Sequence, residues 1–383
     1  MYGEPLVVGD ELLAATGTNE VYGLDARTGR VRWRTGLGVP QPLDGLPCGN
    51  IDPLGVLGTP AYDSATGSVF VAAENRGGRH TLWALDARTG RARWHRSLDT
   101  QPRRDKLAEQ QRSALLVADG RVVTVFGGLA GDCSDYVGYV TSVPTDGRGR
   151  TRSYAVPTAR EAGMWAPPGP VLGTSGSLYV ASGNGAELHG TWDKSDSVIE
   201  LDPTTLAERS VFAPASWRED NVRDLDLGST SPAVVPAADR IVIAGKRGVV
   251  YLLSPRLGGI GSELASLEGC AAFGGAAVVG RTVLLPCLGE TSVRALRVGD
   301  KSLSWGWTRP HLFGSPVVAG SRIYVTDRDT GDLVVLALAT GRELSRHHAG
   351  AVGHFASQTV SGDWVFVPTL TGVTAFAGSP SSS

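Results

Sequence analysis

The sequence predicts an all-β protein made of eight similar units, each a sheet of four antiparallel strands. Glycine contributes 51 and proline 22 of the 383 residues, and a mostly helical chain would not contain so many helix-breaking residues. A short phrase also recurs along the chain at intervals of tens of residues, a period typical of propeller blades or solenoid turns. We therefore expect a single eight-bladed β-propeller over residues 1–378 and a disordered tail over residues 379–383.

The repeated phrase is clearest near the N-terminus. Residues 21–33 read VYGLDARTGRVRW and residues 82–94 read LWALDARTGRARW. Weaker copies follow, and the residues that open the turn in successive copies are Leu24, Leu85, Val143, Leu201, Leu253, Leu296 and Leu336, with a last partial copy at Ala375. The number of residues between successive copies is therefore about the length of one propeller blade throughout the chain.

Each repeat is expected to contain strands A to D. Two β-branched runs separated by a Gly or Asp turn form the A–B hairpin, as in residues 316–326, and the repeated phrase supplies strand C, a tight turn and strand D. Asp25 and Asp86 can accept backbone N–H groups in that turn, and Gly29 and Gly90 can adopt a positive φ. The tryptophans of strand D are expected to fill the space between neighbouring blades. They are Trp33, Trp94 and Trp305.

The eight units begin near Glu4, Gly58, Ser113, Pro168, Ser231, Ala271, Ser315 and Ser357. The last unit has candidate strands at Gln358–Val360, Trp364–Val367 and Val373–Phe376, but the terminal GSPSSS cannot form a fourth. We expect residues upstream of Met1 to provide that strand, together with a leader or lipid anchor. The alternative is a last blade that is open in the native protein.

The charge balance and the apolar runs restrict the class of partner. The chain carries 36 basic and 38 acidic residues, a net charge of −2, so no basic surface for nucleic acid is implied. No apolar run is long enough to span a membrane, and the chain contains no basic-then-apolar leader. We expect a monomer that binds a protein partner or a small molecule.

Four cysteines suggest two disulfides. Cys270 is expected to open strand A of the sixth unit and Cys287 to close strand B, almost opposite each other. Cys48 and Cys133 lie in long loops that should emerge on one face, where a second bridge could form. Two bridges would fit an extracytoplasmic protein, whereas four buried thiols would fit a cytosolic one. No C-x-x-C pair is present, so no zinc or other metal site is predicted.

A ligand site is expected on the propeller axis, where residues just before each strand A and in the B–C turns should converge. The candidates are Glu4, Asp52, Arg112, Trp165, Asp224, Asp226, Lys246, Phe273 and His354, and Phe355 falls in the same group. A quinone or another planar anion could stack on Trp165 and pair with Arg112 and Lys246. The alternative is that Arg112, Asp224 and Asp226 form ion pairs that only hold the loops. No catalytic residue can be assigned.

The phrases Gly23–Trp33 and Ala84–Trp94 resemble the PQQ-like (quinoprotein-type) β-propeller repeat of PQQ-dependent dehydrogenases and the outer-membrane assembly lipoprotein. The resemblance implies an extracytoplasmic, non-catalytic ligand-binding or protein-assembly module, secreted or lipid-anchored. The alternative is a quinoprotein-type oxidoreductase that binds PQQ with calcium. The adjacent cysteine pair of those dehydrogenases is absent, and only three units end the phrase in Trp. A third class, a lyase or hydrolase, would use Asp224, Asp226 and Glu4 as acid and base.

Overall fold

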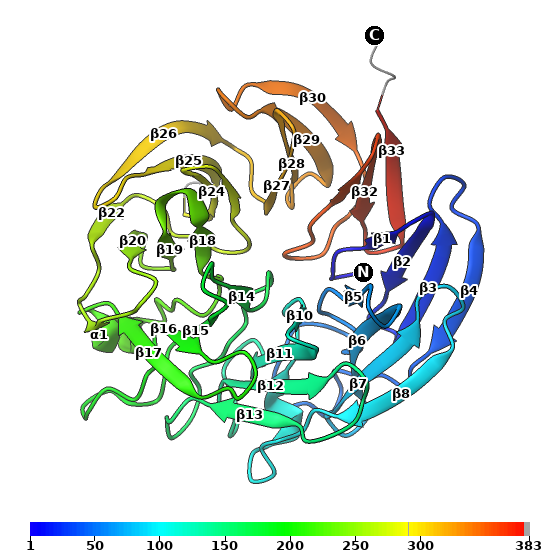
Figure 1. Ribbon diagram of the computed structural model, residues 1–383, viewed down its shortest axis with the longest axis horizontal. Coiled ribbons are helices and arrows are strands. Elements are labelled where there is room, and N and C mark those ends of the chain that lie inside the picture. Colours follow the sequence, from blue (N-terminus) through cyan, green and yellow to red (C-terminus); the bar gives the residue numbers. More distant parts are fainter. Residues whose placement is uncertain (290, 379–383) are drawn as a thin grey trace.

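A computed structural model describes residues 1–289 and 291–378, and it shows eight β-sheets arranged as blades around a ring (Figure 1). Seven blades have four antiparallel strands in sequence order, and the eighth has three among the described residues. The predicted all-β, eight-bladed architecture is therefore confirmed. The predicted tail at residues 379–383 lies outside the described part of the chain.

The first three blades have the following bounds. Blade one contains β1 (Leu6–Val8), β2 (Glu11–Ala15), β3 (Glu20–Asp25) and β4 (Val31–Gly36). Blade two contains β5 (Ala61–Asp63), β6 (Ser68–Asn75), β7 (Arg79–Asp86) and β8 (Ala92–Ser97). Blade three contains β10 (Leu116–Ala118), β11 (Arg121–Gly128), β12 (Tyr139–Pro144) and β13 (Arg152–Ala155), and the short β9 (Glu109–Gln110) extends it by pairing with β11.

The next three blades follow the same order. Blade four contains β14 (Val171–Leu172), β15 (Leu178–Ser182), β16 (Ser197–Leu201) and β17 (Glu208–Ala213), with β21 (Gly259–Ile260) parallel to β17. Blade five contains β18 (Ala233–Val235), β19 (Arg240–Ala244), β20 (Val249–Leu253) and β22 (Ala265–Glu268). Blade six contains β23 (Ala277–Val279), β24 (Thr282–Cys287), β25 (Ser292–Val298) and β26 (Leu303–Pro310).

Blade seven contains β27 (Pro316–Ala319), β28 (Arg322–Thr326), β29 (Asp332–Ala337) and β30 (Glu343–His348), and blade eight contains β31 (Thr359–Ser361), β32 (Trp364–Pro368) and β33 (Val373–Ala377). The connections hold one α-helix, α1 (Trp217–Arg223), and two 3₁₀ turns, η1 (Lys106–Ala108) and η2 (Pro236–Ala238), among the described residues. The helix occupies the insertion before blade five.

The hydrophobic core is divided among the joints between neighbouring blades. Blades one and two share a cluster that includes Leu13 and Val69, and blades two and three share one that includes Phe70 and Phe126. Comparable clusters join each following pair up to blades seven and eight. Within the described residues, no such cluster joins blade eight to blade one. A blade therefore buries its faces against its neighbours, and one of the eight joints is different.

The repeated turn has the predicted geometry. In blade one, Asp25 Oδ1 accepts the backbone N–H groups of Arg27 and Thr28, and Gly29 has a φ of 70°. The turn of blade two repeats these hydrogen bonds around Asp86, and Gly90 has a φ of 69°. The Asp and Gly of the phrase therefore fix the chain reversal between strands C and D.

The tryptophan of strand D lies against the turn glycine of the next blade. A Cβ placed on Gly90 would lie 2.3 Å from the Trp33 ring, and one on Gly147 would lie 2.7 Å from the Trp94 ring. In blade six the expected packing of Trp305 between blades is confirmed, and Trp307, two residues further along, lies against the next turn glycine, Gly341.

The reason for this difference from blades one and two is a longer turn in blade six. Leu24 faces Val31 across the blade-one hairpin, whereas Leu296 faces Trp305, which is two residues further along the chain. Trp305 therefore takes the place of Val31, and Trp307 takes the place of Trp33. Trp305 still packs between two blades, because it joins the cluster shared by blades five and six.

Substitution of the turn glycines tests this packing. Gly90→Ala and Gly29→Ala both place a side chain at a positive φ, which costs about 1–2 kcal/mol. Only Gly90→Ala also pushes a methyl group into a tryptophan ring, because nothing lies within 4 Å of a Cβ at Gly29. That overpacking adds about 1–3 kcal/mol. We expect the urea midpoint to fall clearly further for Gly90→Ala, and equal losses would contradict the packing described here.

Candidate functional site

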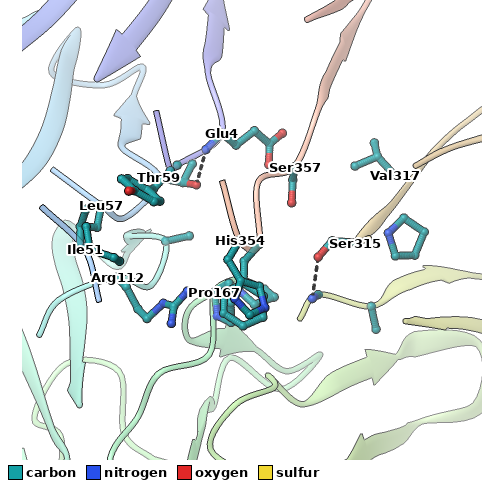
Figure 2. A pocket seen from close by; sticks show the side chains of 18 residues that line it. Glu4, Ile51, Leu57, Thr59, Arg112, Pro167, Ser315, Val317, His354 and Ser357 are labelled. Atoms are coloured by element: carbon teal, nitrogen blue, oxygen red, sulfur yellow. Dashed lines mark hydrogen bonds between the residues drawn. The ribbon is translucent and has the colours of Figure 1, made fainter. Parts of the chain in front are cut away.

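The segments that enter the first strand of most blades converge on a partly open cavity of about 220 Å³, which we call the axial cavity. Its lining comes from both ends of the chain and from several blades (Figure 2). The polar and aromatic residues that line it include Tyr2, Glu4, Thr59, Arg112, Ser315, His354, Phe355 and Ser357. A ring of blades thus brings residues distant in sequence to one point.

A second cavity of about 210 Å³, the funnel cavity, lies among the loops of blades three to six. Its polar and aromatic lining includes Gln110, Asp132, Trp165, Asp224, Asp226, Ser229, Lys246 and Phe273. Arg112, Pro167 and Phe355 line both cavities. These three residues therefore form the wall between the two spaces.

Arg112 is a cation without an acidic partner. Its Cζ lies 4.2 Å from the centre of the Phe355 ring, and the structure shows no ion pair between its guanidinium and any described carboxylate. Burial lowers the pKa of Arg112 to about 10, so the side chain still carries its charge at neutral pH. The residue is half-buried, and a positive charge with only an aromatic neighbour can still pair with an anion.

The aromatic side of this wall is a cluster of three rings, of which two are stacked. The His354 and Phe355 rings are nearly parallel with centres 4.0 Å apart, and the Phe273 ring lies 4.7 Å from Phe355. Burial, with the neighbouring charges of Arg112 and Arg328, lowers the pKa of His354 to about 4. His354 is therefore neutral at physiological pH and acts as part of an apolar surface.

Lys246 is already neutralised by two aspartates. Its Nζ lies 2.6 Å from a carboxylate oxygen of the buried Asp226 and 2.9 Å from one of the exposed Asp224. These carboxylates raise the pKa of Lys246 above its usual value. The ion pairs that the sequence offered as an alternative are therefore present for Asp224 and Asp226, but they involve Lys246 and not Arg112.

Trp165 is fixed in place by glycine backbones. Its Nε1 donates to the carbonyl of Gly128 at 2.7 Å. A Cβ added to Gly127, Gly163 or Gly183 would lie 2.3–2.5 Å from the indole. The indole of Trp165 is therefore packed against main chain while it lines the funnel cavity. It forms a rigid part of the cavity wall and is not a freely exposed surface for stacking.

Glu4 gives the axial cavity a titratable group. It accepts from the Thr359 hydroxyl at 3.1 Å, and its own backbone N–H donates to the Thr59 hydroxyl at 2.9 Å. Burial raises the pKa of Glu4 to about 7. The negative charge in this cavity therefore changes within the physiological pH range.

Eight of the nine predicted site residues line one of the two cavities: Glu4, Arg112, Trp165, Asp224, Asp226, Lys246, Phe273 and His354. Asp52 lines neither. It accepts the backbone N–H of Leu43 at 3.0 Å and lines a groove between blades one and eight. The reason is that the chain runs several residues beyond Asp52 before β5 begins, and Thr59 takes the axial position.

Sequence reasoning missed an acidic residue of the funnel cavity. Asp132 lines this cavity, and its carboxylate accepts the hydroxyl of the buried Tyr136. Both residues lie in the loop between β11 and β12, in which the sequence predicts a role only for Cys133. The sequence signal that could have found them is their position close to Cys133, because a disulfide also holds the residues next to it in place.

Both predicted disulfides are present, Cys48–Cys133 and Cys270–Cys287. The first ties the loop before blade two to blade three, beside the rim of the funnel cavity. Cys270 does not open strand A as expected. It lies ahead of β23, in a segment whose Ala272 forms a bridge with Cys287, and this brings the two Cα atoms to 4.9 Å. Two bridges favour an oxidising compartment.

Comparison with known proteins agrees with this architecture. The family described as "Outer membrane protein assembly factor BamB" matches residues 1–191. A polyvinylalcohol dehydrogenase of a Pseudomonas species is 25% identical over 362 aligned residues, which cover 80% of this chain and 53% of that protein. The chain thus spans about half the length of this relative. The chain carries the PQQ-like β-propeller repeat, and the resemblance seen in its repeated phrase is confirmed.

Two solved structures show the same fold. BamB from Moraxella catarrhalis superposes with a TM-score of 0.66 and 18% identity, covering 97% of this chain and 95% of that chain. The quinohemoprotein alcohol dehydrogenase from Comamonas testosteroni superposes with a TM-score of 0.74 and 18% identity, covering 97% of this chain and 71% of that chain. Similar propellers therefore occur both in an assembly factor and in dehydrogenases. None of the described helices is long and apolar enough to cross a membrane.

The residues of the funnel cavity do not suit pyrroloquinoline quinone, the cofactor that some of these relatives imply. This planar quinone carries three carboxylates, and the funnel cavity offers them Arg112 as one cation without an ion pair among the described residues, beside a lysine that is already paired and the carboxylates of Asp132, Asp224 and Asp226. The volume of about 210 Å³ is also below the ~300 Å³ at which pockets for larger ligands begin. The charge and size of this cavity therefore favour a smaller ligand with less negative charge.

Proposed function

We propose that this chain is an extracytoplasmic, non-catalytic binding module that takes a small ligand through one planar oxyanion, such as a carboxylate, at Arg112. The observation that carries this proposal is the guanidinium without an ion pair among the described residues, which lies in the wall between two partly open cavities. The two disulfides support a secreted or lipid-anchored protein.

The energetic basis is the cost of leaving a half-buried charge unpaired. Removing a cation from water is unfavourable unless an anion or hydrogen-bond acceptors replace the lost hydration. A carboxylate can accept two parallel N–H groups from one guanidinium, and this geometry selects planar oxyanions over other groups. Binding at Arg112 would therefore complete an interaction that the protein alone leaves open.

The neighbouring rings define the rest of the ligand. Phe355, His354 and Phe273 present an aromatic surface beside the guanidinium, and a flat apolar body attached to the carboxylate would pack on it. Cavities of about 220 and 210 Å³ admit a small molecule. A protein partner on the same face would meet Arg112 only through a side chain narrow enough to enter these cavities.

Benzoate and benzamide test this proposal as a charged and a neutral form of one shape. A hydrogen bond to a charged group contributes about 1.5–3 kcal/mol, so benzoate should bind roughly ten- to a hundred-fold more tightly by calorimetry. Arg112→Gln should remove the difference, and Arg27→Gln, at an exposed arginine, should keep it. Equal affinity for the two compounds would contradict the proposal. Saturable binding of PQQ with calcium, together with dye-linked alcohol oxidation, would support the quinoprotein alternative.

The affinity should also depend on pH through Glu4. A carboxylate ligand in the axial cavity is repelled by ionised Glu4, and the pKa of Glu4 is raised to about 7 by burial. Benzoate affinity should therefore increase as the pH falls from 8 to 6, and the dependence should disappear in Glu4→Gln. His354 should not contribute, because its pKa of about 4 leaves it neutral over this range. An unchanged pH profile in Glu4→Gln would exclude Glu4 as the cause.

A further inference from the structure

The turns between the third and fourth strands of blades one to three carry an excess of arginine. Although the net charge of the chain is only −2, each of these turns contains two arginines. All six are exposed, and their side chains form no ion pair or hydrogen bond with the described residues. We call this set the arginine strip, and its members are Arg27, Arg30, Arg88, Arg91, Arg148 and Arg150.

Contacts between blades place these three turns side by side. The turn of blade two lies on β4 of blade one, where the Thr35 hydroxyl donates to the carbonyl of Gly90 at 2.7 Å. The turn of blade three lies on β8 of blade two, where Arg96 donates to the carbonyls of Gly147 and Gly149 at 3.0 and 2.8 Å. Figure 1 shows β4, β8 and β13 as the outer strands of three successive blades. The six arginines therefore occupy neighbouring turns along the rim of the ring.

The acidic residues of the same turns leave this positive charge largely uncompensated. Asp25 and Asp86 each pair with an arginine of the strand that follows the turn, at 2.5 and 2.6 Å. They also accept backbone N–H groups within the turn. Blade three keeps two exposed carboxylates, those of Asp119 and Asp146. The excess of positive charge is therefore greatest over blades one and two.

The same face of the ring has a different charge elsewhere. In an antiparallel blade, the turn after the first strand lies at the same end as the turn after the third. These turns in blades five, six and eight present the exposed carboxylates of Asp239, Asp300 and Asp363. An anionic bilayer that covered the whole face would meet these carboxylates, whereas a narrow polymer across blades one to three would not. The charge distribution therefore favours a linear polyanion.

The chemistry of the strip narrows the class of polyanion. A guanidinium donates two parallel N–H groups to one carboxylate, so arginines suit a chain of carboxylates. Val31 is the only exposed large apolar side chain of β4, β8 and β13, so a protein segment would find little apolar surface for an anchor. Two disulfides favour an oxidising compartment, in which an acidic polysaccharide is a more suitable partner than nucleic acid.

We propose that the arginine strip binds a linear acidic polysaccharide, whose carboxylates pair with the guanidinium groups across blades one to three. One exposed ion pair contributes little by itself, but a polymer carries many carboxylates, and every pair after the first forms within one complex. The site is independent of the oxyanion site at Arg112, because none of the six arginines lines the axial or funnel cavity.

A fluorescein-labelled chain of ten galacturonate residues is the probe. Its binding to the full chain, followed by fluorescence anisotropy, should be saturable in about 20 mM salt and at least about ten-fold weaker in about 150 mM salt, because salt screens exposed charges. The same decamer with its carboxylates converted to methyl esters should not bind, since it keeps the length and loses the charge.

Two quadruple variants remove the same charge from different parts of the surface. The first carries Arg27→Gln, Arg30→Gln, Arg88→Gln and Arg91→Gln, and it should bind the decamer at least ten-fold more weakly. The control changes four exposed arginines outside the strip that also form no ion pair among the described residues, and it should bind as the unmodified chain does. Its changes are Arg103→Gln, Arg256→Gln, Arg322→Gln and Arg342→Gln. Circular dichroism should show that both variants are folded.

Further measurements separate this site from the other site and from other polyanions. Arg112→Gln should leave decamer binding unchanged, and the first quadruple variant should keep its preference for benzoate over benzamide. An oligothymidylate of ten nucleotides and phosphatidylglycerol vesicles should bind more weakly than the decamer. The proposal is overturned if the decamer does not bind, if both quadruple variants lose binding equally, or if either of these other polyanions binds more tightly.

Discussion

The structure depends on the contact between the outer strand of one blade and the repeated turn of the next. A four-stranded sheet has two apolar faces and cannot bury them alone, so each face needs a neighbouring sheet. The turn glycine lets an aromatic ring lie directly on main chain, as Trp33 does on Gly90 and Trp307 on Gly341. This contact recurs at three joints, where it sets the spacing between neighbouring blades.

The ring in turn creates the candidate site. Each blade begins with a segment that approaches the axis, so residues as distant in sequence as Glu4, Arg112 and His354 line one small cavity. Long loops, such as residues 129–138 and 214–232, contribute to the funnel cavity beside it. The Cys48–Cys133 bridge ties the loop before blade two to the first of these loops. The rigid ring of blades thus holds the charged side chain of Arg112 in the cavity wall, whereas loops alone would leave it exposed to solvent.

Much of the fold could be predicted because the repeat encodes it locally. The Asp and Gly of each turn, the alternation in the strands and the tryptophan of strand D all specify contacts within one or two blades. The position of Trp307 could not be predicted, because it depends on a longer turn that changes the register of one hairpin. The approach to the axis was predicted for most site residues, but the pairing of Lys246 with two aspartates and the lack of a partner for Arg112 depend on side-chain positions in different blades.

The most direct test of the central claim is native-state hydrogen exchange along the whole chain. If blades are stabilised by their joints, protection should be high in central strands such as β19, β24 and β28, which have apolar clusters on both sides. It should be lowest in β33 and β1, which border the joint without a cluster. Equal protection of β33, β1 and the central strands would show that each blade is stable by itself and would contradict the account.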